Sequence, residues 1–396
     1  MAEALTDAGH EVIWWTSNFS HHFKRYRSKG WLDTQVDAHF LIRLVTTPGY
    51  RLNIGFGRII RDAVFSYSTY VRGTKMPSPD CIVYYESPFS FGYAGYKLAQ
   101  FHGCPVIYDQ MDLWPELIEQ VFPRPVRPLV KLIFQPVYKS RKRVYEKLDA
   151  AIGLARPYLD VMLREAPVLK SRPHAVIYNG IDVTAFRSMM AESTEILGRL
   201  PKKSDEEVWA VFAGSLGPSY DIPTLLQVAR LLERSSQKVR IVIAGDGPLR
   251  NEVERFATQN PACHLSYLGK LAPESLAPLY RHCDIGLCAY SERSNVEMPD
   301  KFYDYTAAGM PVINSLTGEI RDLIAKRNLG LQYLAGNAED LLKVIEKISS
   351  DTGLRREMAR NSFAAGMEFN QHAQYARLVE IINDLMEKKR LSRYVD

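Results

Sequence analysis

The chain has 396 residues, which is long enough for two domains, and its 46% hydrophobic and 24% charged residues are typical of a soluble globular protein. Its formal net charge of +5 is small for this length and does not indicate a nucleic-acid-binding protein. No apolar run is long enough to span a membrane, and five scattered cysteines without a CxxC pair favour reduced thiols in a cytoplasmic protein over a disulfide or zinc framework.

Short apolar runs alternate with helical patterns along the whole chain. In the first half, the predicted strands are 11–16, 40–45, 81–85, 106–108, 150–154 and 175–178. In the second half, they are 208–212, 239–244, 264–267, 285–289, 312–314 and 330–333. Alternation of strands and helices predicts parallel sheets with helices on both faces, here as two doubly wound domains. Ligands of such domains bind at the carboxyl ends of the strands, and a cleft between two domains is the natural site.

The beginning of the chain is unusual for this type of domain. Residues 2–9 have the pattern of the second half of a helix, and residues 9–12 that of a turn into a strand. A doubly wound domain usually opens with a strand and a glycine-bearing loop. We therefore expect a late-assigned start codon or a truncated chain that lacks the first strand; the alternative is a fold that begins with a helix.

Acidic residues follow the strand predicted at 106–108. Asp109, Asp112 and Glu116 can position an acceptor hydroxyl or act as a general base there. Trp114 offers an apolar platform for a sugar ring. In the alternative interpretation, Asp112 caps the next helix and Trp114 lies in the core, and for Trp114 we favour the core.

Residues 124–147 form a basic segment with interleaved apolar residues. Its cations are Arg124, Arg127, Lys131, Lys139, Arg141, Lys142, Arg143 and Lys147. A basic amphipathic segment can lie on an anionic membrane surface, although such runs are more often a solvated face above a core-facing stripe.

Glycines follow the first two strands of the second half. Gly214 and Gly217 let the backbone approach a ligand closely, and the helix N-terminus that follows suits an anion. The second turn, residues 244–248, has the same pattern, and Asp246 is interpreted as a helix cap. Residues 267–271 can lie against a nucleobase. An ordinary strand-to-helix loop is the alternative for each.

Residues 298–314 are the most informative segment. Pro299 can open a helix and Gly309 can end it before the buried strand 312–314. Lys301 and Asp304 lie three residues apart on one helix face. A cation near a helix N-terminus suits a phosphate, and a carboxylate can accept hydrogen bonds from two sugar hydroxyls. A surface ion pair would explain the segment equally well.

Taken in order, these segments resemble retaining glycosyltransferases of the GT-B fold, the large family of bacterial mannosyltransferases and surface-polysaccharide glycosyltransferases. The matching segments are 5–12, 178–182 with Phe186, the Gly214 turn, 244–248, 267–269, 276–287 and 298–314. The resemblance implies an α/β protein with two facing Rossmann-like, doubly wound domains. It implies an acceptor domain at 1–181, a linker at 182–206, a nucleotide-sugar domain at 207–370, and a last helix within 371–396 that crosses back to the first domain.

The resemblance also assigns residues. It places Asp304 on the ribose hydroxyls, Lys301 on a phosphate, and Glu297 near the donor sugar, with spacing one residue shorter than usual. Ser215 and Tyr220 stand where the family commonly has arginine and lysine, and Asp109 or Gln110 stands near a frequent histidine. The predicted catalytic residues are Asp109, Asp112 and Glu297. The predicted nucleotide-binding residues are Gly214, Ser215, Tyr220, Asp246, Lys270, Leu271, Lys301, Phe302 and Asp304.

The implied function is transfer of a hexosyl or N-acetylhexosaminyl group from a nucleoside diphosphate sugar to a lipid-linked or saccharide acceptor, with retention of configuration. We expect a role in bacterial cell-surface polysaccharide synthesis, on the inner face of the membrane through residues 124–147. No cofactor, metal ion or nucleic acid is expected, since no DxD-like pair ends a suitable strand. The alternatives are a nucleotide-sugar 2-epimerase of the same fold and a non-catalytic partner subunit.

Overall fold

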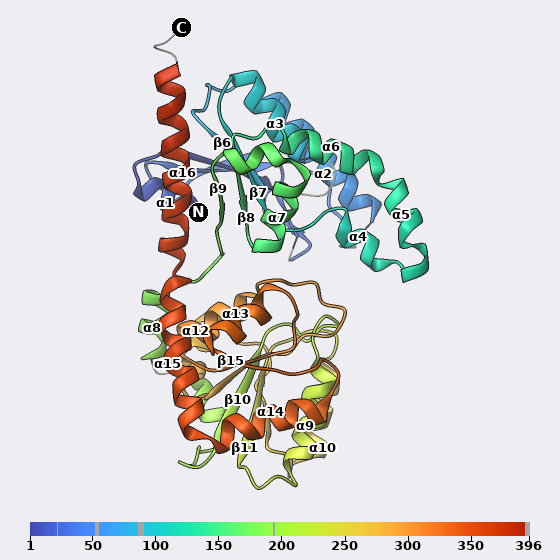
Figure 1. Cartoon of the computed structure of the whole chain (residues 1–396), viewed down its shortest axis with the longest axis vertical. Helices are drawn as coiled ribbons and strands as arrows, with labels where there is room; N and C mark the ends of the chain where they lie inside the picture. Colours follow the sequence, from blue (N-terminus) through green and yellow to red (C-terminus); the bar gives the residue numbers. More distant parts are fainter. Residues whose placement is uncertain (22, 52–54, 86–90, 193–194, 393–396) are drawn as a thin grey trace. The chain divides into compact units, whose positions relative to one another are not determined.

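The computed structural model describes residues 1–21, 23–51, 55–85, 91–192 and 195–392, which form two compact units (Figure 1). Unit 1 contains residues 1–178 and 375–396, and unit 2 contains residues 179–374. Residues 193–194 of the expected linker and residues 393–396 of the expected C-terminal helical segment lie outside the described residues.

Unit 1 contains two main sheets and a short antiparallel ribbon. The first sheet has the order β1-β5-β4, formed by Val12–Ser17, Phe40–Val45 and Leu32–Gln35, with β4 antiparallel to β5. The second is parallel with the order β6-β7-β8-β9, formed by Ile82–Tyr85, Val106–Gln110, Ala150–Gly153 and His174–Val176. Strands β2 (Phe19–Ser20) and β3 (Arg25–Tyr26) form the ribbon.

The six strands predicted for this half are confirmed within two residues at each end, but three further strands were not predicted. Strand β4 is exposed at all four positions, so its sequence has no alternation of apolar and polar residues. Strands β2 and β3 have two residues each, which is too short for any periodic pattern.

The helices of unit 1 are α1 (Ala2–Asp7), α2 (Phe56–Gly73), α3 (Phe91–His102), α4 (Glu116–Val121), α5 (Arg127–Ile133), α6 (Gln135–Tyr145), α7 (Arg156–Glu165) and α16 (Gln371–Ser392), with single 3₁₀ turns at Arg124–Val126 (η1) and Pro167–Ser171 (η2). Some of them cover both faces of the β6–β9 sheet. One hydrophobic core joins the sheet to α3, α6 and α7, through residues such as Tyr108, Tyr145 and Leu159. The other core joins the opposite face to α1 and α16.

The last helix belongs to unit 1 from residue 375 onward. Its buried residues Leu378, Ile382 and Leu385 recur every three or four positions, which places them on one helix face against the sheet. No helix among the described residues is long and apolar enough to cross a membrane.

Unit 2 is built on one parallel sheet of six strands. In sheet order these are β12 (Leu265–Tyr267), β11 (Val239–Ala244), β10 (Val208–Ala213), β13 (Ile285–Cys288), β14 (Val312–Asn314) and β15 (Gly330–Gln332). All six were predicted. The chain order reverses between β10 and β13, which makes the carboxyl ends of these two strands a topological switch point, where doubly wound proteins bind ligands.

The helices of unit 2 include a segment that we expected to be a linker. They are α8 (Val183–Met190), η3 (Glu195–Arg199), α9 (Ile222–Leu232), α10 (Arg250–Gln259), α11 (Pro273–Arg281), α12 (Asp300–Ala307), α13 (Glu319–Arg327), α14 (Ala338–Ser350) and α15 (Thr352–Glu368). The expected linker 182–206 contains α8 and η3 and lies inside unit 2. Phe186 of α8 is buried, with its ring 6.1 Å from that of Tyr280.

Candidate functional site

The switch point of unit 2 holds a buried lysine among aromatic rings. Lys301 is 6% exposed. Its Nζ lies 4.4 Å from the ring centroid of Phe212 in β10, 4.1 Å from that of Tyr220, and 4.8 Å from that of Tyr290, which follows β13. Such cation–π contacts compensate part of the hydration that the ammonium loses on burial. The charge therefore lies at the carboxyl ends of the two strands that flank the switch point.

Glycine keeps the space beside this ammonium free of side-chain atoms. Gly214 has φ of +152°, and a Cβ atom at this position would lie 2.9 Å from Nζ of Lys301. Gly245, at the end of β11, has φ of +153°, and a Cβ there would lie 1.8 Å from the carbonyl oxygen of Gly214. The two glycine turns thus pack backbone against backbone, so both positions require glycine.

The acidic partner on α12 lies one turn beyond the lysine. Asp304 is half-buried, and burial, together with the nearby charge of Asp300, raises its pKa to about 7, although Lys301 opposes this rise. Burial lowers the pKa of Lys301 to about 8, against the effect of the neighbouring acidic groups. Ionisable groups whose pKa values are shifted strongly by burial, as for Lys301 and Asp304, are typical of functional sites.

Helix α12, which carries Lys301 and Asp304, begins and ends where the sequence predicts. Pro299 stands at the N-cap, and Gly309, with φ of +72°, follows the C-cap residue Ala308. Phe302, which we predicted to contact the nucleotide, is fully buried, with its ring 5.4 Å from that of Phe369. Its side chain therefore belongs to the core of unit 2.

Glu297 precedes α12 and contacts the start of α13. Its Oε2 accepts a hydrogen bond of 3.2 Å from the backbone N–H of Glu319. Gly318 has φ of +80°, and a Cβ there would lie 2.3 Å from the same oxygen. Burial raises the pKa of Glu297, and the N–H of Glu319 lowers it. The structure therefore gives this carboxylate a contact at a helix N-terminus beyond β14; its role toward a donor sugar stays a prediction.

The remaining predicted nucleotide-binding residues lie on the surface. Ser215, Asp246 and Lys270 are exposed, and Leu271 is half-buried. Asp246 is not a helix cap, because α10 begins at Arg250 and the Asp246 carboxylate instead accepts a 2.8 Å hydrogen bond from the next residue's N–H. The interpretation of Asp246 as a cap was therefore wrong.

The three loops beyond β10, β11 and β12 are connected by hydrogen bonds. Backbone N–H groups link Gly214 to Ala244 over 2.9 Å and Gly245 to Gly269 over 2.7 Å. The Tyr267 hydroxyl donates a 2.9 Å bond to the carbonyl of Gly245. The segment that we predicted to lie against a nucleobase is thus fixed relative to the glycine turns.

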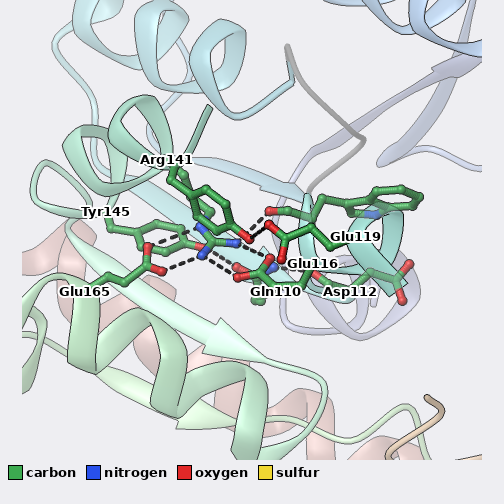
Figure 2. A network of polar contacts seen from close by, with 9 residues as sticks. Gln110, Asp112, Glu116, Glu119, Arg141, Tyr145 and Glu165 are labelled. Carbon is green, nitrogen blue, oxygen red and sulfur yellow. Dashed lines mark hydrogen bonds and ion pairs between the residues drawn. The ribbon is translucent and has the colours of Figure 1, made fainter. Parts of the chain in front are cut away.

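In unit 1, the predicted catalytic residues follow β7. Asp109 is 9% exposed, and burial raises its pKa to about 7. The amide of Gln110 is fully buried; it donates to the carbonyl of Asp112 and accepts from the hydroxyl of Tyr145 (Figure 2). Asp112 is exposed and caps no helix, since α4 begins at Glu116 with Pro115 as its N-cap, so the capping interpretation was wrong.

A buried arginine holds the loop that follows β7. Figure 2 shows Arg141 between Glu116 and Glu165, with both carboxylates directed at its guanidinium. Its Nη atoms donate two 2.8 Å bonds to Glu116 and one 2.6 Å bond to the carbonyl of Trp114. Trp114 is 7% exposed, which confirms its predicted place in the core. The loop bearing Asp112 is therefore attached to α6 and α7.

The basic segment 124–147 is divided between core and surface. Arg141 is 6% exposed, so its expected place on a membrane-binding surface was wrong. Arg124, Lys131, Lys139, Lys142, Arg143 and Lys147 are exposed. Leu129, Leu132 and Ile133 of α5, at positions i, i+3 and i+4, are 61%, 65% and 66% exposed. We call these three residues the α5 apolar face.

Two aromatic residues of the lysine site, Phe212 and Tyr290, were not predicted. Both stand at the carboxyl ends of the strands that flank the switch point. The sequence carries no local signal for them, because their position depends on which strands are neighbours in the sheet. Among the described residues, no group of three or more His, Cys, Asp or Glu side chains is placed to hold a metal ion.

Two family models match the chain and together span most of it. The model described as glycosyltransferase family 4 matches residues 1–185, and the model described as glycosyl transferases group 1 matches residues 194–364. An uncharacterized glycosyltransferase of Methanocaldococcus jannaschii, MJ1607, is 27% identical over 192 residues. That match covers 47% of each protein, so the chain spans about half the length of this curated relative.

Solved structures resemble the whole chain. The structure of trehalose-6-phosphate from E. coli bound with UDP-2-fluoro glucose has a TM-score of 0.68 at 12% identity, over 96% of this chain and 94% of that one. WaaG, a glycosyltransferase involved in lipopolysaccharide biosynthesis, has a TM-score of 0.61 at 14% identity, over 96% and 93%. At such identities the likeness establishes the fold, and it confirms the predicted GT-B architecture of two Rossmann-like units.

Proposed function

Because this chain is a glycosyltransferase of the GT-B fold, we propose that it transfers a sugar from a nucleoside diphosphate to a lipid-linked or saccharide acceptor, with retention of configuration. The observation that carries the proposal is the buried Lys301 at the switch point of unit 2. A cation at this position matches the negative charge that develops on a leaving diphosphate.

In this proposal, Lys301 and Asp304 bind two parts of the same donor. The ammonium binds the diphosphate beside the glycine turn at Gly214, which adds no side chain of its own next to Nζ. The carboxylate accepts hydrogen bonds from the two ribose hydroxyls. Both groups lose hydration on burial, and a bound nucleotide replaces that hydration with charge-assisted hydrogen bonds.

The catalytic roles are part of the same proposal. Burial raises the pKa of Asp109 to about 7, and a carboxyl group with such a pKa suits the exchange of a proton with an acceptor hydroxyl. Asp112 helps to orient the acceptor, and Glu297 contacts the donor sugar. Little covalent chemistry is required of the protein, whose main contributions are charge stabilisation and alignment of the two substrates.

Substrate and cellular role are supported by the related structures. One neighbour binds UDP-2-fluoro glucose, which supports a nucleotide-sugar donor. We propose that the transferred group is hexosyl or N-acetylhexosaminyl. WaaG, another neighbour, is involved in lipopolysaccharide biosynthesis, which supports a role in bacterial cell-surface polysaccharide synthesis. We propose that transfer needs no metal ion, because Lys301 and helix N-termini supply the positive charge; equal rates with and without EDTA would support this.

The proposed location is the inner face of the cell membrane, with α5 as the contact. The α5 apolar face exposes three large aliphatic side chains, and exposed cations lie before, within and after it along the chain. Apolar side chains can enter the lipid interface while the cations bind anionic headgroups. The attachment would bring the enzyme to lipid-linked acceptors.

The test is a transfer reaction with a panel of nucleotide sugars and a lipid-diphosphate acceptor, followed by mass spectrometry of the products. The proposal predicts an acceptor that gains the mass of one sugar residue and an equimolar amount of nucleoside diphosphate. An epimerised sugar with no change in the acceptor would instead indicate a 2-epimerase. Absence of any product and of nucleotide binding would indicate a non-catalytic partner subunit.

A further inference from the structure

The ammonium of Lys301 is enclosed by aromatic rings and makes no hydrogen bond with the part of the chain that the structure describes. Burial lowers its pKa to about 8, and Cys288, Asp304 and Asp300 raise it through space. An ammonium has three N–H donors, and none of the three has an acceptor among these residues. Packing against the rings therefore decides where the ammonium lies.

Two of the rings belong to tyrosines that are also paired through their backbones. Tyr220, in the loop after β10, and Tyr290, after β13, form an isolated antiparallel bridge. Their ring centroids lie 4.8 Å apart at an interplanar angle of 40°. The ring of Phe212 lies 5.6 Å from that of Tyr220, at an interplanar angle of 77°. We call Phe212, Tyr220 and Tyr290 the aromatic cage, because they pack on one another as well as on the ammonium.

The loop beyond β14 fixes Tyr290 from a second side. Tyr290 is 4% exposed. The hydroxyl of Ser315 accepts a 2.8 Å hydrogen bond from the backbone N–H of Tyr290 and lies 2.8 Å from its carbonyl oxygen, to which it donates. Ser315 is itself buried, and its N–H donates a 3.2 Å bond to the carbonyl of Cys288. The backbone that carries the Tyr290 ring is thus bonded on both sides.

A buried carboxylate fixes the backbone next to Tyr220. The backbone N–H of Asp221 donates a 3.2 Å bond to the carbonyl of Ala289, the neighbour of Tyr290. The Asp221 carboxylate accepts three hydrogen bonds of 2.7–3.0 Å, from the hydroxyls of Thr224 and Tyr333 and the N–H of Gly336. Both tyrosines of the aromatic cage are therefore held by hydrogen bonds that do not involve Lys301.

The glycine turn beside the ammonium adds no cation of its own. Residues 213–221 contain no lysine, arginine or histidine. The match between this turn and a phosphate thus depends on the position of Lys301. Charge-assisted hydrogen bonds are short, and they weaken when the donor is displaced or misaligned. An ammonium that is held in one position binds a phosphate better than an ammonium that moves.

We propose that Tyr290 is a positioning residue for the nucleotide-sugar donor, and that it acts through Lys301 by holding the ammonium where the diphosphate binds. The inference rests on the proposed function, because it assigns a further residue to the same donor site. Tyr290 does not have to touch the donor for this role. The alternative is a core residue that only stabilises unit 2.

The test is a double-mutant cycle with Tyr290→Leu and Lys301→Met, in which UDP, GDP, ADP and CDP are titrated into the full chain. For the nucleoside diphosphate that binds wild type, Tyr290→Leu should weaken binding roughly fivefold when Lys301 is present and change it less than about twofold in Lys301→Met. Tyr290→Phe keeps the ring and should bind within about twofold of wild type. Equal weakening by Tyr290→Leu in both backgrounds would overturn the inference, because the tyrosine would then act without the lysine.

The pH dependence of binding gives a second readout. Wild-type affinity should fall above about pH 8, as Lys301 loses its proton, and below about pH 7, as Asp304 gains one. Loss of a ring destabilises the ammonium, so Tyr290→Leu should move the alkaline limb to lower pH by about half a unit and leave the acid limb in place. Burial raises the pKa of the Tyr220 and Tyr290 hydroxyls, so neither adds a limb in this range. An alkaline limb that does not move would contradict the positioning role.

Phe256→Leu is the control, because it makes the same kind of change at a buried aromatic residue of α10. It should lower the melting temperature and leave nucleotide affinity and both pH limbs unchanged. If Tyr290→Leu does not fold, Tyr290→Met, with its adaptable side chain, takes its place in the cycle. Wild-type protein that binds no nucleoside diphosphate would refute the donor site and this inference with it. Binding that Lys301→Met weakens and Tyr290→Leu does not would overturn the positioning role alone.

Discussion

Arg141 donates two hydrogen bonds of 2.8 Å to the two carboxylate oxygens of Glu116, across 25 residues of sequence. Glu165 holds the same guanidinium from α7. The ion pairs of Arg141 with Glu116 and Glu165 fix the loop that carries Asp112 and Trp114. Arg141 therefore has a structural role, although it lies in the basic segment 124–147. Its immediate neighbours Lys142 and Arg143 are exposed.

Replacing Arg141 should destabilise unit 1. Arg141→Met leaves Glu116 and Glu165 partly buried without their cation, which should cost about 3–5 kcal/mol of unfolding free energy, as for other broken buried pairs. Urea unfolding measures the change. Lys142→Met, the matched control on the same helix, should change stability by less than about 0.5 kcal/mol. Equal stability of both variants would mean that these ion pairs contribute nothing.

Removing the buried ammonium should stabilise unit 2. The folded-state pKa of Lys301 lies near 8, below its ordinary value of 10.5, so at neutral pH the folded state holds a charge that burial disfavours. Lys301→Met should raise the unfolding free energy at pH 7 by about 1–3 kcal/mol, since one pKa unit corresponds to about 1.4 kcal/mol and some cation–π energy is lost. The penalty is complete below pH 8 and disappears above about pH 10.5, where the amine is neutral in both states. Lys326→Met, at an exposed lysine of α13, is the control, and a destabilised Lys301→Met would show that the lysine serves the fold.

Asp304 should make stability depend on pH in a defined window. Its folded-state pKa, near 7, lies above the ordinary value of 3.8, so the folded state holds a proton that the unfolded state has lost between these values. Below about pH 4 the carboxyl group is neutral in both states and burial carries no penalty. The free energy of unfolding therefore falls as the pH rises from about 4 toward 7. Asp304→Asn should match wild type at pH 4 and exceed it by about 1–3 kcal/mol above pH 7. Thermal melts across pH measure this, with exposed Asp322→Asn as control; parallel curves would refute the prediction.

The α5 apolar face should bind membranes. Leu129→Ser with Leu132→Ser and Ile133→Ser removes its aliphatic side chains, and co-sedimentation with anionic vesicles should then be lost. Lys142→Glu with Arg143→Glu should weaken binding at low salt, since each cation near an anionic surface contributes about 1 kcal/mol and salt screens that attraction. Phe101→Ser, at an exposed apolar residue of α3, should bind as wild type does. If wild-type protein does not bind anionic vesicles at low salt, residues 124–147 are a solvent-exposed face and not a membrane contact.

Much of the fold was predictable, because a buried parallel strand is an uninterrupted apolar run. Strands β5, β11 and β14 were predicted to the residue. Strand β4 was not, because exposed residues lack periodicity. The position of Lys301 and Asp304 on one helix face was predictable, because they lie three residues apart on one short helix. The buried position of Arg141, the core position of Phe302 and the ring of Tyr290 near Lys301 arise from contacts between distant segments, which single-sequence periodicity does not encode.

The most direct test of the central claim is titration of nucleoside diphosphates, and of the corresponding nucleosides, into wild-type protein and Lys301→Met. The account predicts that one nucleoside diphosphate binds wild type at one site per chain, and that Lys301→Met weakens it at least tenfold, as expected for a charge-assisted bond worth about 1.5–3 kcal/mol. Binding of the free nucleoside should change little, because the lysine's partner is phosphate. Wild-type protein that binds no nucleoside diphosphate, or a variant that loses both ligands equally, would contradict the assignment of this site.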